Sequence, residues 1–305
     1  MYPLLEELRS ALTYEIALAG ALAPLDEGTS SGKVAPAEAL HEAGGEHSPA
    51  VERVEAAPCT GEGATAPPPA VVKESSPPPA SMPATDLFGN PVDPTRDPSR
   101  SPYERIEALI PADSPLHRMH TLDEVARYVA ETVLIPLDAQ RLNPVFGTGN
   151  PEADLMVIGE APGADEDRQG EPFVGRAGQL LNKILAAIGF DRDDVYIANI
   201  LKSRPPNNRD PLPEEVAAHI PILYKQIALV RPKLILAVGK TAGNSLLGRS
   251  SSLKDLRGKF HDFHGLPVLV TYHPAALLRN PQWKRPTWED VKLLRARYDQ
   301  LTGRA

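Results

Sequence analysis

The sequence "DLMVIGEAPG" at residues 154–163 joins a short apolar run to a loop built of Gly, Pro and Glu. An apolar run of this length is too short for a buried helix and is typical of a strand covered on both faces. Comparable runs recur at residues 195–199, 234–238 and 267–271, and helix-like patterns lie between them at 177–189, 213–230 and 241–248. This alternation predicts an α/β fold, a doubly wound sandwich in which helices flank a central four-stranded parallel sheet.

The remainder of the chain divides into two further segments. Residues 1–21 place apolar side chains at helical spacing and are expected to form a short amphipathic helix. Residues 22–101 are a Pro/Ala/Glu-rich linker, and residues 22–100 alone carry 14 of the 33 prolines. A segment of this composition cannot bury enough apolar surface to offset its chain entropy, so we expect a disordered N-terminal extension before a single domain at 102–305.

Composition narrows the class of protein. The net charge is −8, but residues 1–115 carry 7 basic against 18 acidic side chains, and residues 116–305 carry 25 against 22. The mildly basic second part is compatible with a polyanionic partner. No run of 18 apolar residues suggests a membrane span, and no basic start followed by an apolar run suggests a secretory signal, so a cytoplasmic protein is expected. The single cysteine, Cys59, excludes an intramolecular disulfide and a four-cysteine metal site.

Unusual loops follow all four predicted strands. In an open parallel sheet, ligands bind beyond the carboxyl ends of the strands, so these loops are expected to meet at one edge. They carry an amide (Asn199), an aromatic ring (Phe173) and an imidazole (His273), which together suit a small planar heterocycle. Basic side chains expected near the same rim, and suited to phosphates, are Arg204, Arg209, Lys240, Arg257, Arg279 and Lys284. Each residue also has an ordinary interpretation: Asn199 as a turn-forming amide, His273 as a surface histidine.

Three blocks carry a resemblance to a known family. "GEAPGADEDRQGEPFVGRAGQLL", "YIANILKSRPPNNRDPLPEE" and "TYHPAALLRNP" resemble, in order, the signature blocks of the family 4 uracil-DNA glycosylases, and the similarity spans roughly residues 125–295. The resemblance implies that residues 102–305 form a catalytic domain for base excision repair. Its substrate would be uracil-containing DNA, and the enzyme would flip uracil out and hydrolyse its N-glycosidic bond, leaving an abasic site.

The resemblance also implies roles for individual residues. Phe173 stacks on uracil, Asn199 reads its edge, and His273 stabilises charge developing on O2. The turn formed by Gly159, Ala161, Pro162 and Gly163 completes the base site. Ala161 stands where a related family has its water-activating aspartate, which leaves Glu160 or Glu166 to help the water. In the last block, Leu277 resembles the wedge that fills the gap in the duplex, and Arg279 suits a phosphate.

Family 4 enzymes usually hold a four-iron, four-sulfur cluster on four cysteines. Matching the sequence to that pattern puts Thr132, Ile135, Ser203 and His219 at the four positions. Iron–sulfur iron requires thiolates, so no cofactor and no metal are expected. We expect Ile135 and neighbouring apolar residues to pack in the place of the cluster, with Ser203 and His219 hydrogen-bonding locally.

Alternatives remain open at this point. One is a protein that binds uracil or abasic DNA on the same fold without cleaving it. A nucleotide-binding transferase is a second, but the sequence lacks a Gly-rich phosphate loop. A variant that traps uracil covalently depends on a basic, histidine-containing insert that the loop at 203–211 does not have. Leu87-Phe88 in "ATDLFGNP" (84–91) loosely resembles the short peptide by which bacterial DNA enzymes dock on the sliding clamp. The protein is expected to be a monomer.

Overall fold

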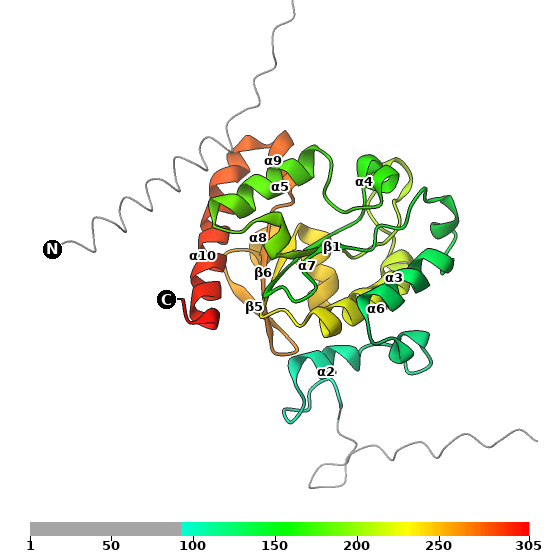
Figure 1. The fold of residues 1–305 in the computed structure, drawn as a ribbon. Coiled ribbons are helices and arrows are strands. Elements are labelled where there is room, and N and C mark those ends of the chain that lie inside the picture. The colour runs from blue at the N-terminus through cyan, green and yellow to red at the C-terminus, as the bar shows by residue number, and fades with distance from the viewer. Residues whose placement is uncertain (1–92, 305) are drawn as a thin grey trace, which may run out of the picture. The chain divides into compact units, whose positions relative to one another are not determined.

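The computed structural model describes residues 93–304, in which helices surround one twisted sheet (Figure 1). The strands are β1 (Thr148–Gly149), β2 (Leu155–Gly159), β3 (Tyr196–Asn199), β4 (Leu234–Val238), β5 (Phe260–Phe263) and β6 (Leu266–Thr271). The helices are α2 (Pro102–Glu107), α3 (Leu122–Glu131), α4 (Ala164–Gln169), α5 (Arg176–Ala187), α6 (Pro213–Val230), α7 (Lys240–Leu247), α8 (Leu253–Leu256), α9 (Pro274–Arg279) and α10 (Lys284–Thr302). Short 3-10 turns include η2 (Asp138–Gln140), η3 (Arg192–Asp194) and η4 (Pro206–Asn208).

The strand order is β1-β3-β2-β4-β6-β5. The four inner strands are parallel, as the apolar runs predict, and every residue of β2, β3 and β4 is buried. Two antiparallel edge strands, β1 and β5, were not predicted. Both are short, and β5 reads "FHDF", so neither has the continuous apolar run that marks the inner strands.

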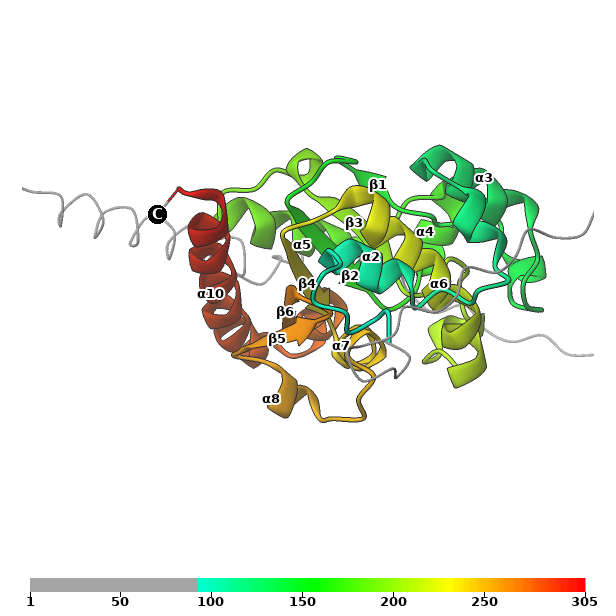
Figure 2. The same cartoon turned by 90° about the horizontal axis from the view of Figure 1, so that it is seen from below.

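Helices cover both faces of the sheet (Figure 2). On one face, α5, α9 and α10 pack against alternate residues of the strands such as Val157 and Leu236. On the other face, α2, α6, α7 and α8 pack against the intervening residues, such as Met156 and Ala237. Alternate residues of a strand point to opposite faces, so one apolar run supplies both cores.

The two faces define where a ligand can bind. The chain leaves β2 toward α5 on one face and leaves β3 toward α6 on the other, so the loops diverge at the carboxyl ends of these neighbouring strands. Such a divergence opens a crevice in doubly wound folds. Gly159 and Asn199 are paired there as the last residues of β2 and β3.

Several expectations fall on residues 1–92, outside the part that the structure describes. These are the amphipathic helix at 1–21, most of the linker at 22–101 and the clamp-like segment at 84–91. Within residues 93–304, no helix is both long and apolar enough to cross a membrane.

Candidate active site

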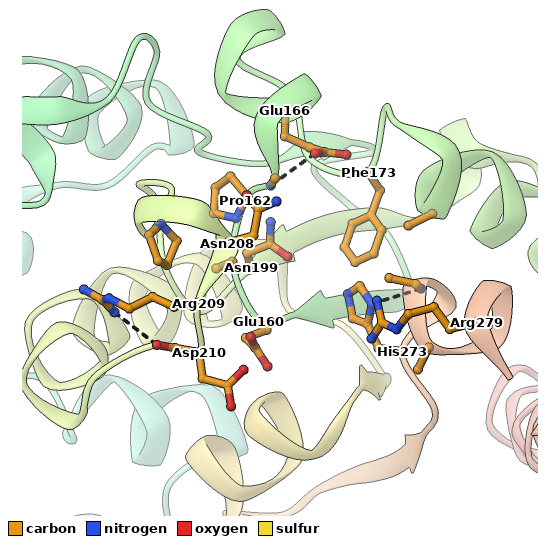
Figure 3. A pocket seen from close by; sticks show the side chains of 16 residues that line it. Glu160, Pro162, Glu166, Phe173, Asn199, Asn208, Arg209, Asp210, His273 and Arg279 are labelled. Atoms are coloured by element: carbon orange, nitrogen blue, oxygen red, sulfur yellow. Dashed lines mark hydrogen bonds between the residues drawn. The ribbon is translucent and has the colours of Figure 1, made fainter.

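A cavity of about 350 Å³ lies at the carboxyl ends of β2, β3 and β6 (Figure 3). This volume is within the range of small-molecule sites. The cavity is lined by Glu160, Ala161, Pro162, Gly163, Glu166, Phe173, Ala177, Asn199, Pro205, Asn208, Arg209, Asp210, His273, Ala275, Ala276 and Arg279. The amide, ring and imidazole singled out in the sequence therefore come together, although they are up to 100 residues apart.

The backbone around Asn199 is held by the sheet, while its side-chain oxygen has no hydrogen-bond donor within the described residues. Its side chain is buried, and its Oδ1 finds no hydrogen-bond donor within the described residues. The Ile200 N–H donates to the Gly159 carbonyl at 3.0 Å, which extends the β2–β3 pairing past Asn199. An unpaired buried oxygen costs about 1–3 kcal/mol, so a ligand that donates to Oδ1 recovers that free energy.

Gly159 makes room for this amide. A Cβ at residue 159 would overlap Asn199 Oδ1 and would lie 2.6 Å from Phe173 Cζ. The amide and the ring therefore approach each other across the glycine. Gly159 is not among the residues that line the cavity, but it sets the spacing of two that are, Asn199 and Phe173.

A fully buried lysine lies behind Asn199. Lys202 Nζ donates to the Asn199 carbonyl at 2.7 Å and to Gln226 Oε1 at 2.6 Å. Burial lowers the pKa of Lys202 to about 7. Neither Lys202 nor Gln226 was predicted from the sequence, because a lysine in a basic loop and a glutamine in a helix ordinarily face solvent.

Phe173 lies in the loop between α4 and α5. Its φ of 54° is in the left-handed region, which is rare for an L-residue with a bulky side chain. The ring centroid lies 5.5 Å from that of His273, and both rings line the cavity. The backbone after the ring is held by Glu166, whose Oε1 accepts hydrogen bonds from the N–H groups of Val174 and Gly175, both at 3.0 Å.

His273 is the N-cap of α9. Its Nδ1 accepts a hydrogen bond from the Ala275 N–H at 3.2 Å, so in a neutral ring the proton is on Nε2. Burial, assisted by the positive charge of Arg279, lowers the pKa of His273 to about 4. The ring is therefore neutral at pH 7 and has one N–H available for a ligand.

The two candidate carboxylates differ in their surroundings. Both oxygens of Glu166 accept from backbone N–H groups, because Oε2 is bonded to Gly163 N at 3.1 Å. Glu166 thus joins the turn at 159–163 to the loop of Phe173, and is not free to hold water. Burial raises the pKa of Glu160, and a hydrogen bond from Thr241, which acts to lower the pKa, offsets this rise only in part.

Some of the basic residues expected at the rim line the cavity, and the others do not. Arg279 is exposed and lines the cavity. Arg204 is half-buried, does not line the cavity and donates to Asn208 Oδ1 at 2.8 Å. Arg209 also lines the cavity, with both terminal nitrogens bonded to Glu215. Lys240 is exposed at the first position of α7, and Lys284 begins α10, but neither lines the cavity.

Two residues lie elsewhere than the sequence analysis expected. Arg257 donates to Asp290 at 3.0 and 2.7 Å and packs over the Tyr272 ring, so its guanidinium is engaged inside the domain. Leu277 is fully buried against the core beneath α9 and does not reach the surface, where a wedge must lie. The sequence could not show which of the adjacent residues Leu277 and Leu278 is buried, because both lie in the same short helix after His273.

A second buried group of polar residues lies beside the loop that follows β3. We name Asp138, Arg141, Ser203 and His219 the Asp138 cluster. Asp138 Oδ1 accepts from Ser203 Oγ at 2.5 Å and from His219 Nε2 at 3.0 Å, and Arg141 Nη1 lies 3.5 Å away. Burial opposes ionisation of Asp138, but the hydrogen bonds from His219 and Ser203 outweigh it and hold the pKa of the carboxyl well below its usual range.

The Asp138 cluster joins distant segments of the chain. Asp138 Oδ2 accepts from the N–H groups of Leu134 and Ile135, and Arg141 also donates to Ser203 Oγ and to the Thr132 carbonyl at 3.2 Å. His219 Nδ1 accepts from the Lys202 N–H at 3.1 Å, so its Nε2 carries the proton given to Asp138. The cluster thus ties residues 132–141 to the side chain of Ser203 and, through His219, to the backbone of Lys202.

Comparison with known proteins gives the family. Residues 146–292 match the uracil DNA glycosylase superfamily. The type-4 uracil-DNA glycosylase of Archaeoglobus fulgidus is 40% identical over 182 residues, which are 57% of this chain and 92% of that protein. That of Thermotoga maritima is 42% identical over 182 residues, or 57% and 95% of the two chains. This chain belongs to the type-4 uracil-DNA glycosylase family.

The type-5 uracil-DNA glycosylase of Thermus thermophilus is more distant, at 31% identity over 166 residues, which are 48% of this chain and 74% of that protein. The family resemblance inferred from the three sequence blocks is confirmed. The matched region coincides with the sheet and the loops that form the cavity.

The iron–sulfur cluster usual in type-4 enzymes does not fit this member. One cysteine among 305 residues cannot supply four thiolates. The four positions expected for the ligands do converge, but on Asp138 and Arg141: Ile135, Ser203 and His219 donate to the carboxylate, and Thr132 accepts from the guanidinium. No group of three or more His, Cys, Asp or Glu suited to a metal occurs within residues 93–304.

The expectation for the residues that replace the cluster was partly wrong. Ile135 does pack on the core beneath α6, but the centre of the region is polar. Ser203 and His219 do not bond locally, because their shared partner Asp138 is 65 residues from Ser203. Asp138 and Arg141 were not predicted from the sequence, because both look like ordinary surface residues of the loop "PLDAQRL".

Proposed function

We propose that this protein is a uracil-DNA glycosylase that hydrolyses the N-glycosidic bond of deoxyuridine in DNA and leaves an abasic site. The observation that carries the proposal is the open Asn199 amide, buried and without a donor for Oδ1 within the described residues, beside the rings of Phe173 and His273. Family membership, together with the activity that the names of the relatives state, supports the same reaction.

The pocket accounts for the choice of base. Asn199 Oδ1 accepts from uracil N3–H, and its NH₂ donates to O4, while Phe173 stacks on the ring. Cytosine presents the opposite donor and acceptor at these two atoms, which would leave both amide groups unpaired in a buried site. Sites that read a base through such hydrogen bonds discriminate strongly, because the wrong base leaves buried polar groups without partners. The nucleotide must leave the duplex to reach this pocket, which costs a few kcal/mol.

Bond cleavage places negative charge on uracil O2. The neutral His273 ring donates its Nε2–H to that oxygen, and the donor is already oriented because Nδ1 is held by Ala275. A donor aimed at charge that develops only in the transition state accelerates the step, by roughly 10²–10³-fold for a good one. The electron pair of the glycosidic bond leaves with uracil as its anion, water adds to the sugar cation, and the proton that this water loses ends on the uracil anion.

Glu160 is the carboxylate suited to hold that water. It lines the cavity and is not tied to backbone N–H groups in the way that Glu166 is. Arg279, which is exposed and lines the cavity, is the side chain suited to the phosphates that flank the flipped nucleotide.

A cleavage assay tests the proposal. A labelled oligonucleotide with one uracil is incubated with the protein, treated with alkali to break abasic sites, and resolved on a gel. We expect cleavage at uracil by the wild type and about 100-fold less by Asn199→Ala. Binding without cleavage would identify the non-catalytic alternative. The absence of both binding and cleavage would overturn the assignment of the site.

A further inference from the structure

The turn that carries Phe173 is strained and therefore needs support. Its φ of 54° is disfavoured for an L-residue, at a cost of about 1–3 kcal/mol per residue held in such a region. This backbone conformation sets the direction of the Cα–Cβ bond of Phe173, and therefore where its ring can lie. Whatever fixes the peptides at residues 172 and 173 also fixes the face that the ring presents to the cavity.

One guanidinium holds both of these peptides. Arg192 Nη2 donates to the Pro172 carbonyl at 2.6 Å, and Nη1 donates to the Phe173 carbonyl at 3.2 Å. Nη1 also donates to Asn182 Oδ1 of α5, at 3.2 Å, which orients the guanidinium itself. Arg192 lies in η3, between α5 and β3, and does not line the cavity.

The other side of the turn is held separately. Glu166 accepts from the N–H groups of Val174 and Gly175, immediately after the ring. The backbone of α5 packs directly on the Phe173 carbonyl, since a Cβ at Gly178 would overlap that oxygen. Arg192 is thus the one side chain, among those the structure describes, that donates to the carbonyls on the N-terminal side of the turn.

We infer that Arg192 is a positioning residue for uracil excision, which sets the stacking platform by fixing the carbonyls of Pro172 and Phe173. This role rests on the proposed function, because the platform has a task only if a base enters the cavity. Arg192 itself touches neither the base nor the reacting bond. Its effect on the reaction passes through the orientation of the Phe173 ring.

The chain offers a matched control for loss of this contact. Arg295 also binds two consecutive carbonyls, Ile188 at 2.9 Å and Gly189 at 3.4 Å, but at the end of α5 and away from the cavity. We expect Arg192→Met to lower kcat/KM for a uracil oligonucleotide by about tenfold, because misplacement of a binding group by about 1 Å has effects of this order or larger. Arg295→Met should shift the urea unfolding midpoint as Arg192→Met does, but should leave kcat/KM within twofold of wild type.

A double-mutant cycle separates positioning from general destabilisation. In a Phe173→Leu background, adding Arg192→Met should change kcat/KM by less than twofold, because the platform is already gone. Inhibition by free uracil, which reports stacking without bond cleavage, should weaken in Arg192→Met and recover in part in Arg192→Lys. If Arg192→Met does not fold, Arg192→Lys is carried through the same cycle.

The outcomes distinguish the two proposals. No excision of uracil by the wild type removes the proposed function. Excision by the wild type, combined with equal activity of the Arg192 and Arg295 variants, or with a full tenfold effect of Arg192→Met in the Phe173→Leu background, overturns the role of Arg192 alone.

Discussion

The cavity and the Asp138 cluster are both polar and buried, yet their hydrogen bonding differs. Asp138 receives donors on both carboxylate oxygens from Ser203, His219, Leu134 and Ile135. Asn199, the last residue of β3 and four residues before Ser203, leaves Oδ1 without a donor in the described part of the chain. One region satisfies its polar atoms internally, and the other keeps an acceptor free.

The difference separates a site for a ligand from a site for stability. A buried acceptor without a partner costs free energy, so it persists where a ligand supplies the donor. A fully connected buried network rigidifies the segments that it joins. Substitutions in the cavity should therefore change activity at constant stability, and those in the Asp138 cluster should do the reverse.

The largest effect is expected at Asp138. Asp138→Ala leaves Arg141, His219 and Ser203 without their shared partner, and breaking a buried ion pair in this way lowers the free energy of unfolding by about 3–5 kcal/mol. Urea denaturation measures the change. Ser203→Ala is the control, with a loss of about 1 kcal/mol, because Asp138 keeps its other donors. Equal stability of Asp138→Ala and wild type would remove the contrast between the two regions.

Asn199→Ala should give the opposite result. We expect uracil excision to fall by about 100-fold, because the variant loses contacts made in a desolvated pocket. The free energy of unfolding should stay the same or rise, since the substitution removes an unpaired buried oxygen. A drop in stability comparable to that of Asp138→Ala would show that Asn199 belongs to the scaffold.

A single methyl group at Gly159 tests the geometry of the cavity floor. In Gly159→Ala the added carbon would crowd Asn199 Oδ1 and Phe173 Cζ, so excision should fall by about tenfold or more. Gly243→Ala is the control, because its Cβ would press on Val270 in the core at 2.8 Å and away from the cavity. That variant should lose stability but keep its activity per folded molecule. Full activity of Gly159→Ala would mean that the amide and the ring do not need their present spacing.

The same contrast explains which features the sequence could predict. The inner strands of the sheet were predictable because they are buried on both faces and read as continuous apolar runs. Asn199, Phe173 and His273 were predictable because each follows a strand or a glycine-rich turn at the edge where ligands bind. Their signals are local, and topology alone brings them together.

The supporting residues could not be found in this way. Asp138, Arg141, Lys202 and Arg192 are charged side chains in loops, and charged residues in loops ordinarily face solvent. Their roles depend on partners that the fold supplies, such as the Asn199 carbonyl for Lys202 and the Phe173 carbonyl for Arg192. Leu277 shows the converse, because its place in a loop-helix motif suggested exposure while the packing of α9 buries it.

The last prediction concerns the pH dependence of stability and isolates the contribution of His273. Because the pKa of His273 is lowered to about 4 in the folded state, from about 6.5 in an unfolded chain, the unfolded chain binds the extra proton between these values. Stability should therefore fall as the pH drops from about 6.5 to about 4, by roughly 2–3 kcal/mol, because each pKa unit of difference between the two states is worth about 1.4 kcal/mol. The carboxyl of Asp138 contributes to stability in a different pH window, because its lowered pKa makes its stabilisation disappear only below about pH 4.

In His273→Asn, the new side chain still caps α9 but does not titrate, so the loss of stability between pH 6.5 and pH 4 should be smaller than in wild type. Urea denaturation of both proteins at pH 7 and pH 4.5 gives the comparison. Parallel losses in the two proteins would show that His273 is not held neutral in the cavity, and its role as a neutral donor to uracil O2 would have to be abandoned.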